Sequence, residues 1–262
     1  MSNILDKIIA DKRKEVALKK SVVPVSQLES AALFSRKTIS LAHNLRESHT
    51  GIIAEHKRRS PSKDVINQKL SVTDIARGYE KAGVSGMSIL TDRKYFGGSL
   101  EDLLLVRTVA NIPLLRKEFI IDEYQLFEAK AHGADVILLI AAVLSRKEIE
   151  SLSQCAKSLG LDVLLEIHNE EELHKSVMPS LDMLGVNNRN LKTFEVSIDT
   201  SKQLAAIIPD EFVKVSESGI SNTEAIRDLQ QYGYRGFLIG ENFMKTENPG
   251  ESAKEFIQKL KK

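Results

Sequence analysis

The sequence predicts an α/β protein in which eight parallel strands close into a barrel. Short apolar, β-branched runs recur eight times, at intervals of roughly 20 to 35 residues, and the stretches between them have helical spacing. Strict alternation of strand and helix is typical of a parallel sheet. Eight such units in about 210 residues is the count of a (β/α)8 TIM barrel, here with a helical extension before the first strand.

The expected strands occupy residues 51–57, 86–92, 113–120, 136–143, 162–167, 183–188, 212–219 and 236–243. Helical spacing is clearest over residues 73–83 and 123–133. Several expected helices end in a glycine, which best tolerates the left-handed conformation beyond a helix; these are Gly83, Gly133, Gly160 and Gly233. An open doubly wound sheet is the alternative, but no expected strand is followed by a Gly-x-Gly-x-x-Gly or Gly-x-x-x-x-Gly-Lys-Ser/Thr loop.

We expect one domain over residues 1–262, with residues 1–50 as the amino-terminal extension and residues 51–262 as the barrel. The segment ILDKIIADKRKEVALKK predicts a charged helix with one apolar stripe. The stripe consists of Ile4, Leu5, Ile8, Ile9, Ala17 and Leu18. A helix that caps the barrel is the simplest interpretation, and a role in covering substrate or binding a partner subunit stays open.

Composition limits the class of protein. With 262 residues, 42% of them hydrophobic, and a net charge of +1, the chain can bury one sizeable core and has no charge excess that suggests nucleic acid or an anionic membrane. The single cysteine, Cys155, excludes an internal disulfide and a thiolate metal cage. The sequence shows neither a signal-peptide core nor an apolar run long enough to span a bilayer, so we expect a cytoplasmic protein.

Polar and charged residues, together with one phenylalanine and one glycine, gather where the expected strands end. They are Glu55 and Lys57 on the first strand, Lys117 and Phe119 on the third, Glu166 on the fifth, Asn187 and Arg189 on the sixth, and Glu217, Ser218 and Gly219 on the seventh. Alternate residues of a strand share a face, so Glu55 and Lys57 should project together. An ordinary ion pair would explain them, but charges in a barrel mouth are costly unless they pair or serve chemistry. Their convergence therefore favours an active site at the carboxyl ends of the strands.

Two turns with small residues follow the last two strands. Ser218-Gly219 and Gly240-Glu241 lie in the loops where this fold usually binds phosphate, and Ser60 in the first loop offers a further hydroxyl. Each turn alone would be ordinary, whereas both together favour a phosphate site. The six histidines show no metal-binding spacing, so no metal is expected. His168 could orient Glu166, although a surface or loop position is the favoured interpretation.

Several motifs, in this order and spacing, resemble the indole-3-glycerol phosphate synthase family over nearly the whole chain. The clearest are IIAEHKRRSPSK, SILTDRKYFGGSL, PLLRKEFIIDEYQ, LGVNNRNL and VSESGI. The resemblance implies conversion of 1-(2-carboxyphenylamino)-1-deoxyribulose 5-phosphate to indole-3-glycerol phosphate in tryptophan biosynthesis. Carbon dioxide and water are lost, and no metal or cofactor is required. Other enzymes of the tryptophan pathway are candidate partners.

The resemblance also implies roles for individual residues. Lys117 matches the general acid, and Glu166 the carboxylate that accepts or relays a proton during dehydration. Lys57 matches a second lysine near the substrate carboxylate or the leaving hydroxyl, with Glu55 holding it. Asn187 and Arg189 match polar residues that position the substrate and the general base. The other matched residues are Glu217 at the mouth, Phe119 as an aromatic wall, and Ser60, Lys63, Ser218, Gly219, Gly240 and Glu241 near the phosphate.

The chain departs from the family pattern at two positions. Glu241 replaces a small residue, so its carboxylate is expected to turn away from phosphate, and Asp64 replaces the glycine of Ser-Pro-Ser-Lys-Gly. Two other functions compete with this one. Phosphoribosylanthranilate isomerase shares the fold but places a cysteine at the first strand, where this chain has Glu55 and Lys57. A non-catalytic barrel that binds a phosphorylated ligand, or serves as a subunit of a pathway complex, would not need the acid and base.

Overall fold

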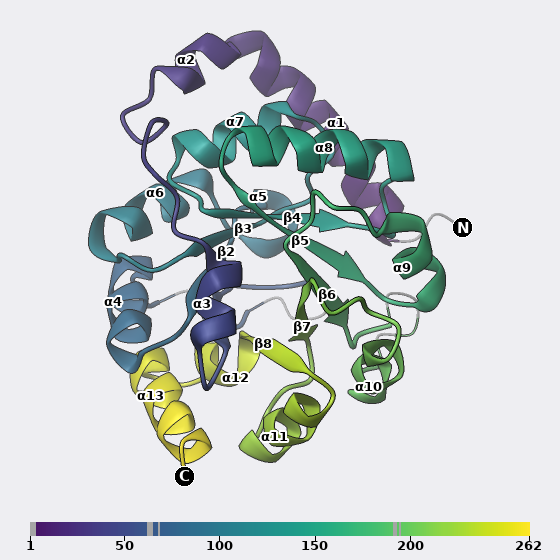
Figure 1. Ribbon diagram of the computed structural model, residues 1–262. Helices are drawn as coiled ribbons and strands as arrows, with labels where there is room; N and C mark the ends of the chain where they lie inside the picture. Colours follow the sequence, from purple (N-terminus) through teal and green to yellow (C-terminus); the bar gives the residue numbers. More distant parts are fainter. Residues whose placement is uncertain (1–3, 62–64, 68, 191–192, 194) are drawn as a thin grey trace.

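The computed structural model describes residues 4–61, 65–67, 69–190, 193 and 195–262. Eight parallel strands form a closed barrel in sequence order (Figure 1), which confirms the predicted TIM barrel. The strands are β1 (Ile52–His56), β2 (Gly86–Leu90), β3 (Leu114–Lys117), β4 (Val136–Ile140), β5 (Asp162–Ile167), β6 (Met183–Asn187), β7 (Val213–Glu217) and β8 (Tyr234–Ile239).

Helices precede the barrel and follow its strands. Three come before β1, namely α1 (Ile4–Val22), α2 (Val25–Glu29) and α3 (Leu41–Glu47). The others are α4 (Val72–Ala82), α5 (Arg93–Phe96), α6 (Leu100–Val109), α7 (Tyr124–Ala131), α8 (Arg146–Ser158), α9 (Glu170–Ser176), α10 (Asp199–Ala205), α11 (Thr223–Gln231), α12 (Glu241–Met244) and α13 (Pro249–Leu260). The described residues contain no helix that combines the length and the apolar character needed to cross a membrane.

The expected strand ends were wrong at several places. The third strand stops at Lys117 rather than residue 120, where the Phe119 amide donates to the Glu118 side chain (2.8 Å) instead of continuing a ladder. The seventh stops at Glu217 because Ser218 has a φ of 68°. The eighth runs over Tyr234–Ile239, earlier than expected, because α12 begins at Glu241. The three strands thus end at a side-chain hydrogen bond, a left-handed residue and the start of a helix, respectively.

The predicted glycine positions beyond the helices are confirmed. Gly83, Gly133, Gly160 and Gly233 have φ values of 81°, 84°, 73° and 84°. Such a conformation is strained for residues with a Cβ atom, which explains why glycine stands at these points.

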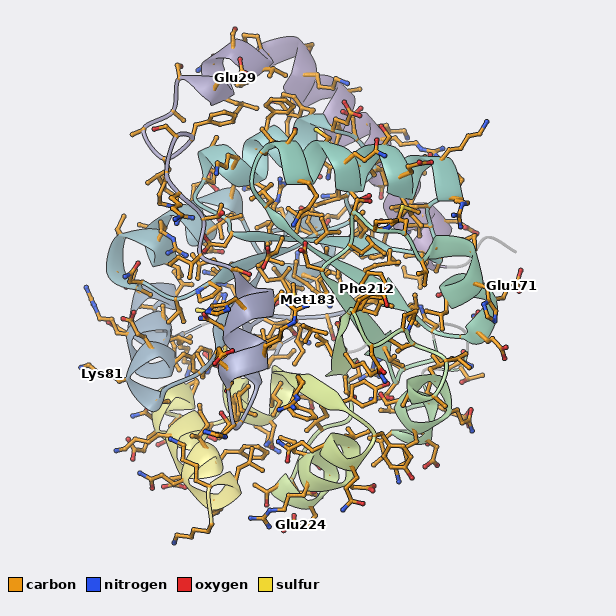
Figure 2. All side chains as sticks on the ribbon, in the orientation of Figure 1. Glu29, Lys81, Glu171, Met183, Phe212 and Glu224 are labelled. Atoms are coloured by element: carbon orange, nitrogen blue, oxygen red, sulfur yellow. The ribbon has the colours of Figure 1, made fainter. Side chains whose placement is uncertain are left out.

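The barrel interior is closed at the amino ends of the strands and open at the carboxyl ends. Leu41 and Leu45 of α3 pack with interior residues such as Ile53, Leu115 and Met183 in one buried cluster. Figure 1 shows α3 in front of the strands, and Figure 2 shows Met183 near the centre of the molecule. The charged side chains labelled on the helices, Glu29, Lys81, Glu171 and Glu224, extend outward in the same view and are exposed. Helix α3 therefore leaves only the carboxyl ends available to a substrate.

Helix α1 packs against α7 (Figure 1). Ile8, Ile9 and Val16 are buried, as an apolar stripe requires. Ala17 is exposed and Leu18 is 66% exposed, so the assignment of these two residues to the stripe was wrong. The buried position one turn from Ile8 and Ile9 is taken instead by Lys12. The face of α1 that meets the barrel is therefore partly ionic.

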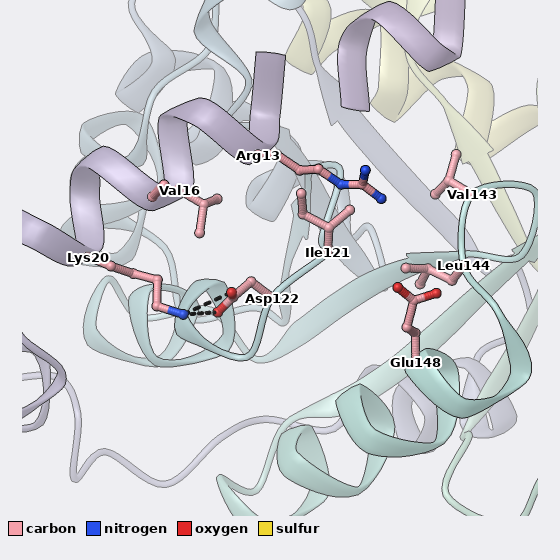
Figure 3. A pocket seen from close by; sticks show the side chains of 9 residues that line it. Arg13, Val16, Lys20, Ile121, Asp122, Val143, Leu144 and Glu148 are labelled. Atoms are coloured by element: carbon pink, nitrogen blue, oxygen red, sulfur yellow. Dashed lines mark hydrogen bonds and ion pairs between the residues drawn. The ribbon is translucent and has the colours of Figure 1, made fainter. Parts of the chain in front are cut away.

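A groove lies between α1, the loop after β3 and the start of α8. It has a volume of about 400 Å³, with Val16, Ile121 and Leu144 among its lining residues. Figure 3 shows the ion pair that links α1 to the loop, in which Lys20 Nζ lies 2.9 Å from Asp122 Oδ2. This groove is separate from the barrel mouth and lies where the amino-terminal extension meets the side of the barrel.

Candidate active site

A cavity of about 220 Å³ opens at the carboxyl ends of the strands. Eleven of the residues singled out from the sequence line it: Glu55, Lys57, Ser60, Lys117, Phe119, Glu166, Asn187, Arg189, Glu217, Ser218 and Glu241. Gly219 and Gly240 adjoin lining residues in sequence, while Lys63 and Asp64 lie outside the described residues. Ile4, Leu5 and Ile8 also line the cavity, so α1 covers the site as well as packing on the barrel.

Glu55 and Lys57 project to the same side of β1. Lys57 Nζ lies 2.7 Å from Glu55 Oε1, and Ser88 Oγ donates to the other carboxylate oxygen at 3.4 Å. Burial alone would raise the pKa of Glu55, but the charges of Lys57 and Lys117 bring it below its ordinary value. A Cβ atom at Gly240 would come within 2.7 Å of Glu55 Oε1, so glycine there leaves room for the carboxylate.

Lys117 stands between two carboxylates. Its Nζ lies 3.2 Å from Glu166 Oε2 and forms a shorter contact with Glu217 Oε2. Burial alone would lower the pKa of Lys117, but Glu217, Glu166 and Glu55 together raise it above its ordinary value. The side chain is therefore an ammonium group that can donate a proton.

Glu217 is the unusual carboxyl group of the site. Burial raises its pKa to about 7 against the opposing charge of Lys117, and Glu166 and Glu55 act in the same direction as burial. Among the described residues, its Oε1 atom has no hydrogen-bond partner. Gly185 on the neighbouring strand makes room for this oxygen, because a Cβ atom there would overlap it. Glu217 can therefore change its protonation state near neutral pH.

Glu166 is held by several groups. Besides Lys117, the Asn187 side chain hydrogen-bonds to it, and His168 Nε2 lies 3.5 Å from its Oε1 atom. Burial would raise the pKa of Glu166, but Lys117 and these neighbours bring it below its ordinary value. Asn187 is itself held, since its Oδ1 atom accepts the Arg189 backbone N–H at 3.0 Å. Glu166 is thus an ionised carboxylate in a fixed position, which suits a base.

An aromatic wall lines the side of the cavity next to β3. The rings of Phe119 and Phe96 have centroids 6.0 Å apart and planes tilted by 39°. Leu138 and Ile140 of β4 also line the cavity. Sequence reasoning found Phe119 but missed Phe96, which lies in the SILTDRKYFGGSL motif. Together these side chains offer a flat apolar surface to an aromatic ring.

The loop after β7 has an unusual backbone. Ser218 and Gly219 have φ values of 68° and 79°, and a Cβ atom at Gly219 would come 2.5 Å from Val196 Cγ1. Buried Asn188 holds the loop, because its Nδ2 atom donates to the Ser218 carbonyl and to Ser216 Oγ, each at 3.0 Å. The sequence did not single out Asn188, which lies inside the LGVNNRNL motif beside two residues that it did. The described residues contain no cluster of three or more His, Cys, Asp or Glu side chains suited to a metal ion.

Comparison with known sequences decides the family. The sequence model of indole-3-glycerol phosphate synthase matches residues 5–256. A protein of that name from Bacteroides thetaiotaomicron is 48% identical over 260 residues, which cover 99% of this chain and 100% of the relative. The chain belongs to the indole-3-glycerol phosphate synthase family. The resemblance inferred from its motifs is confirmed.

Membership of the indole-3-glycerol phosphate synthase family establishes the kind of protein. The chain is an enzyme, a carboxy-lyase of tryptophan biosynthesis that acts on a small phosphorylated substrate. This outcome agrees with the activity expected from the sequence and not with the non-catalytic alternative.

Solved structures of lower similarity share the fold with this member of the indole-3-glycerol phosphate synthase family. Thiamine phosphate pyrophosphorylase from Pyrococcus furiosus has a TM-score of 0.60 at 15% identity, over 85% of this chain and 98% of that one. N-(5'-phosphoribosyl)anthranilate isomerase from the same organism has a TM-score of 0.57 at 13% identity, over 81% and 99%. At such identities the likeness concerns the barrel alone.

Proposed function

We propose that Lys117 and Glu166 are the acid and the base with which this chain performs the reaction of its family. The observation that carries the proposal is the position of Lys117 Nζ, 3.2 Å from Glu166 and in closer contact with Glu217, inside a cavity with an aromatic wall. An ammonium group and an ionised carboxylate on separate strands can act on one bound substrate at successive steps.

Ring closure comes first. The aromatic carbon that bears the carboxylate attacks the ketone carbon, the carbonyl electron pair moves to oxygen, and that oxygen takes the proton of Lys117. Phe119 and Phe96 support the aromatic ring in this approach. Lys57, held by Glu55 at 2.7 Å, pairs with the substrate carboxylate. The carboxylate then leaves as carbon dioxide, and the electrons of its bond restore the aromatic ring.

Dehydration follows. The hydroxyl group made in the first step leaves as water after a lysine protonates it, and Glu166 accepts the proton that the new ring loses. Asn187 orients Glu166 by its hydrogen bond, and Arg189 is joined to Asn187 through its backbone N–H. Glu217 keeps Lys117 aligned between the steps. Carbon dioxide and water are therefore the only by-products.

The phosphate group occupies the opposite end of the cavity in this proposal. The left-handed turn at Ser218-Gly219 and the turn at Gly240-Glu241, where β8 leads into α12, bring backbone N–H groups to one place. Ser60 adds a hydroxyl group from the first loop. Lys63, proposed on family resemblance, would add a cation.

The extension and the barrel act as one domain in this proposal, because the cavity takes side chains from α1 as well as from the strands. We place the reaction in the cytoplasm, in keeping with Cys155, a free thiol. Association with other enzymes of the tryptophan pathway remains a proposal based on the family.

One assay tests the activity. Purified protein should convert 1-(2-carboxyphenylamino)-1-deoxyribulose 5-phosphate to a fluorescent indole product without added metal. Retention of tight substrate binding with no turnover would contradict the proposal. Glu166→Gln, which keeps the size of the base but neither its charge nor its second accepting oxygen, should lower kcat by about a hundredfold or more.

A further inference from the structure

We infer that His168 is a positioning residue that relays the proton collected by Glu166 outward to Glu172. The inference rests on the proposed role of Glu166 as the base. His168 lies in the loop between β5 and α9, which agrees with the expected surface or loop position, but its side chain is only 9% exposed.

The ring is oriented on one side by Glu172. His168 Nδ1 lies 3.1 Å from Glu172 Oε2, and the same oxygen accepts the His168 backbone N–H at 2.8 Å. Glu172 is in turn fixed at the start of α9, because its backbone N–H donates to Asn169 Oδ1 at 2.9 Å and its Oε1 accepts from Asn169 Nδ2 at 3.2 Å. The carboxylate thus holds a proton on Nδ1 and leaves Nε2 with a lone pair.

The other side of the ring faces the base. Nε2 lies 3.5 Å from Glu166 Oε1, too far for a good hydrogen bond, and it has no hydrogen-bond partner among the described residues. Catalytic contacts are often long before substrate binds and shorten in the complex. A shift of a few tenths of an ångström would join Nε2 to the oxygen of Glu166 that Lys117 does not contact.

Burial falls along this chain of groups. The side chains of Glu166, His168 and Glu172 are 7%, 9% and 15% exposed. Glu166 takes a proton from the newly formed ring of the substrate and passes it to His168 Nε2. The proton on His168 Nδ1 then moves to Glu172, and Glu166 returns to its carboxylate form. The side chains of Glu166, His168 and Glu172 thus form a path for the proton from the cavity toward solvent.

The charged groups around His168 set the pH at which the relay works. Glu172 faces it from α9, Glu166 from β5 and Glu217 from β7, while Lys117 of β3 lies beyond Glu166. Burial would lower the pKa of His168, but the three carboxylates raise it above its ordinary 6.5. Because the relay needs an unprotonated Nε2, kcat should fall as pH falls through this raised value.

His168→Asn tests the relay, with His174→Asn as the matched control. His174 forms the same kind of pair on the outer face of α9, with Nε2 3.1 Å from Glu170 Oε1, and its side chain is 66% exposed. His168→Asn should lower kcat by about tenfold with little change in KM. It should also remove the part of the fall in kcat at low pH (the acid limb of the pH profile) that protonation of His168 causes. The control should leave both unchanged.

Glu172→Gln provides a second measurement that does not remove the ring. Loss of the carboxylate should move the acid limb to lower pH, because one of the charges that raise the His168 pKa is gone. The relay would be overturned if kcat and the pH profile were unchanged in both His168→Asn and Glu172→Gln. The proposed function would stay intact in that case if the wild type turned over substrate and Glu166→Gln lost activity. Absence of wild-type turnover would instead overturn the function.

Discussion

Lys12 of helix α1 lies 3.1 Å from Glu118, the residue between Lys117 and Phe119. Lys12 Nζ also lies 3.0 Å from Asp92, where the chain leaves β2. Glu118 in turn accepts the Phe119 backbone N–H at 2.8 Å and the Thr91 hydroxyl at 2.9 Å. The amino-terminal helix is therefore joined by a buried ion cluster to the segments after β2 and β3, which carry the aromatic wall and adjoin the proposed acid at the end of β3.

Lys12→Met should destabilise the protein and impair catalysis. Burial alone would lower the pKa of Lys12, but Glu118 and Asp92 raise it above its ordinary value, so the ammonium group balances two buried carboxylates. Leaving those charges without their cation should lower the free energy of unfolding by about 3 kcal/mol or more, measured by urea denaturation. The matched control is Lys20→Met, which breaks a half-exposed pair on the same helix and should cost no more than about 1 kcal/mol. Equal losses of unfolding free energy in the two variants would show that the buried ion cluster stabilises the protein no more than a surface ion pair does.

The sequence predicted those parts of the site that lie close together along the chain. Glu55 and Lys57 are two residues apart on one strand, so the alternation of side chains was enough to place them together. The strand ends that carry Lys117, Glu166 and Glu217 could be brought together once a barrel was inferred, because the topology of that fold gathers them.

The rest depended on packing between distant segments. Lys12 was charged, so it was left out of the apolar stripe, and its partners Asp92 and Glu118 lie far along the chain. Leu18 was apolar and was placed in the stripe, yet it faces solvent. Phe96, at the end of α5, meets Phe119 of the loop after β3 in the lining of the cavity, although the two lie on separate β/α units. The periodicity of a sequence indicates which side of a helix or strand a residue occupies, but not which residues of other segments that side contacts.

Lys117→Ala should lower kcat by about 10² to 10⁴ and raise KM far less. The proton of Lys117 is needed in the transition state, whereas the phosphate and aromatic contacts of the substrate remain. Steady-state kinetics on the purified variant measure both constants. Lys254→Ala, which removes a surface lysine on α13, should match the wild type. An unchanged kcat in Lys117→Ala would move the role of acid to Lys57.

Gly240→Ala should weaken the active site without breaking the barrel. The added methyl group would come 2.7 Å from Glu55 Oε1 and 3.2 Å from Glu55 Cβ, so the carboxylate must move and its bond with Lys57 must lengthen. We expect kcat/KM to fall by about tenfold or more, with a loss of unfolding free energy of about 1 to 3 kcal/mol. Unchanged kcat/KM in the variant would show that the Glu55–Lys57 geometry is not required.

Glu217→Gln should gain stability relative to the wild type as pH rises, and Glu166→Gln should show the opposite trend. The pKa of Glu217 is raised from its ordinary 4.5 to about 7, so the folded state binds more protons than the unfolded state between these values, and wild-type stability due to this group falls as pH rises. Glutamine removes that loss, a relative gain of up to about 3 kcal/mol between pH 4.5 and 7. The pKa of Glu166 is lowered, so its contribution is present above pH 4.5 and is lost as pH falls through the folded value. Urea denaturation of wild type and both variants tests each trend in its own window, which is pH 4.5 to 7 for Glu217→Gln and below pH 4.5 for Glu166→Gln. A Glu217→Gln slope parallel to that of the wild type between pH 4.5 and 7 would contradict the assignment of the raised pKa to Glu217.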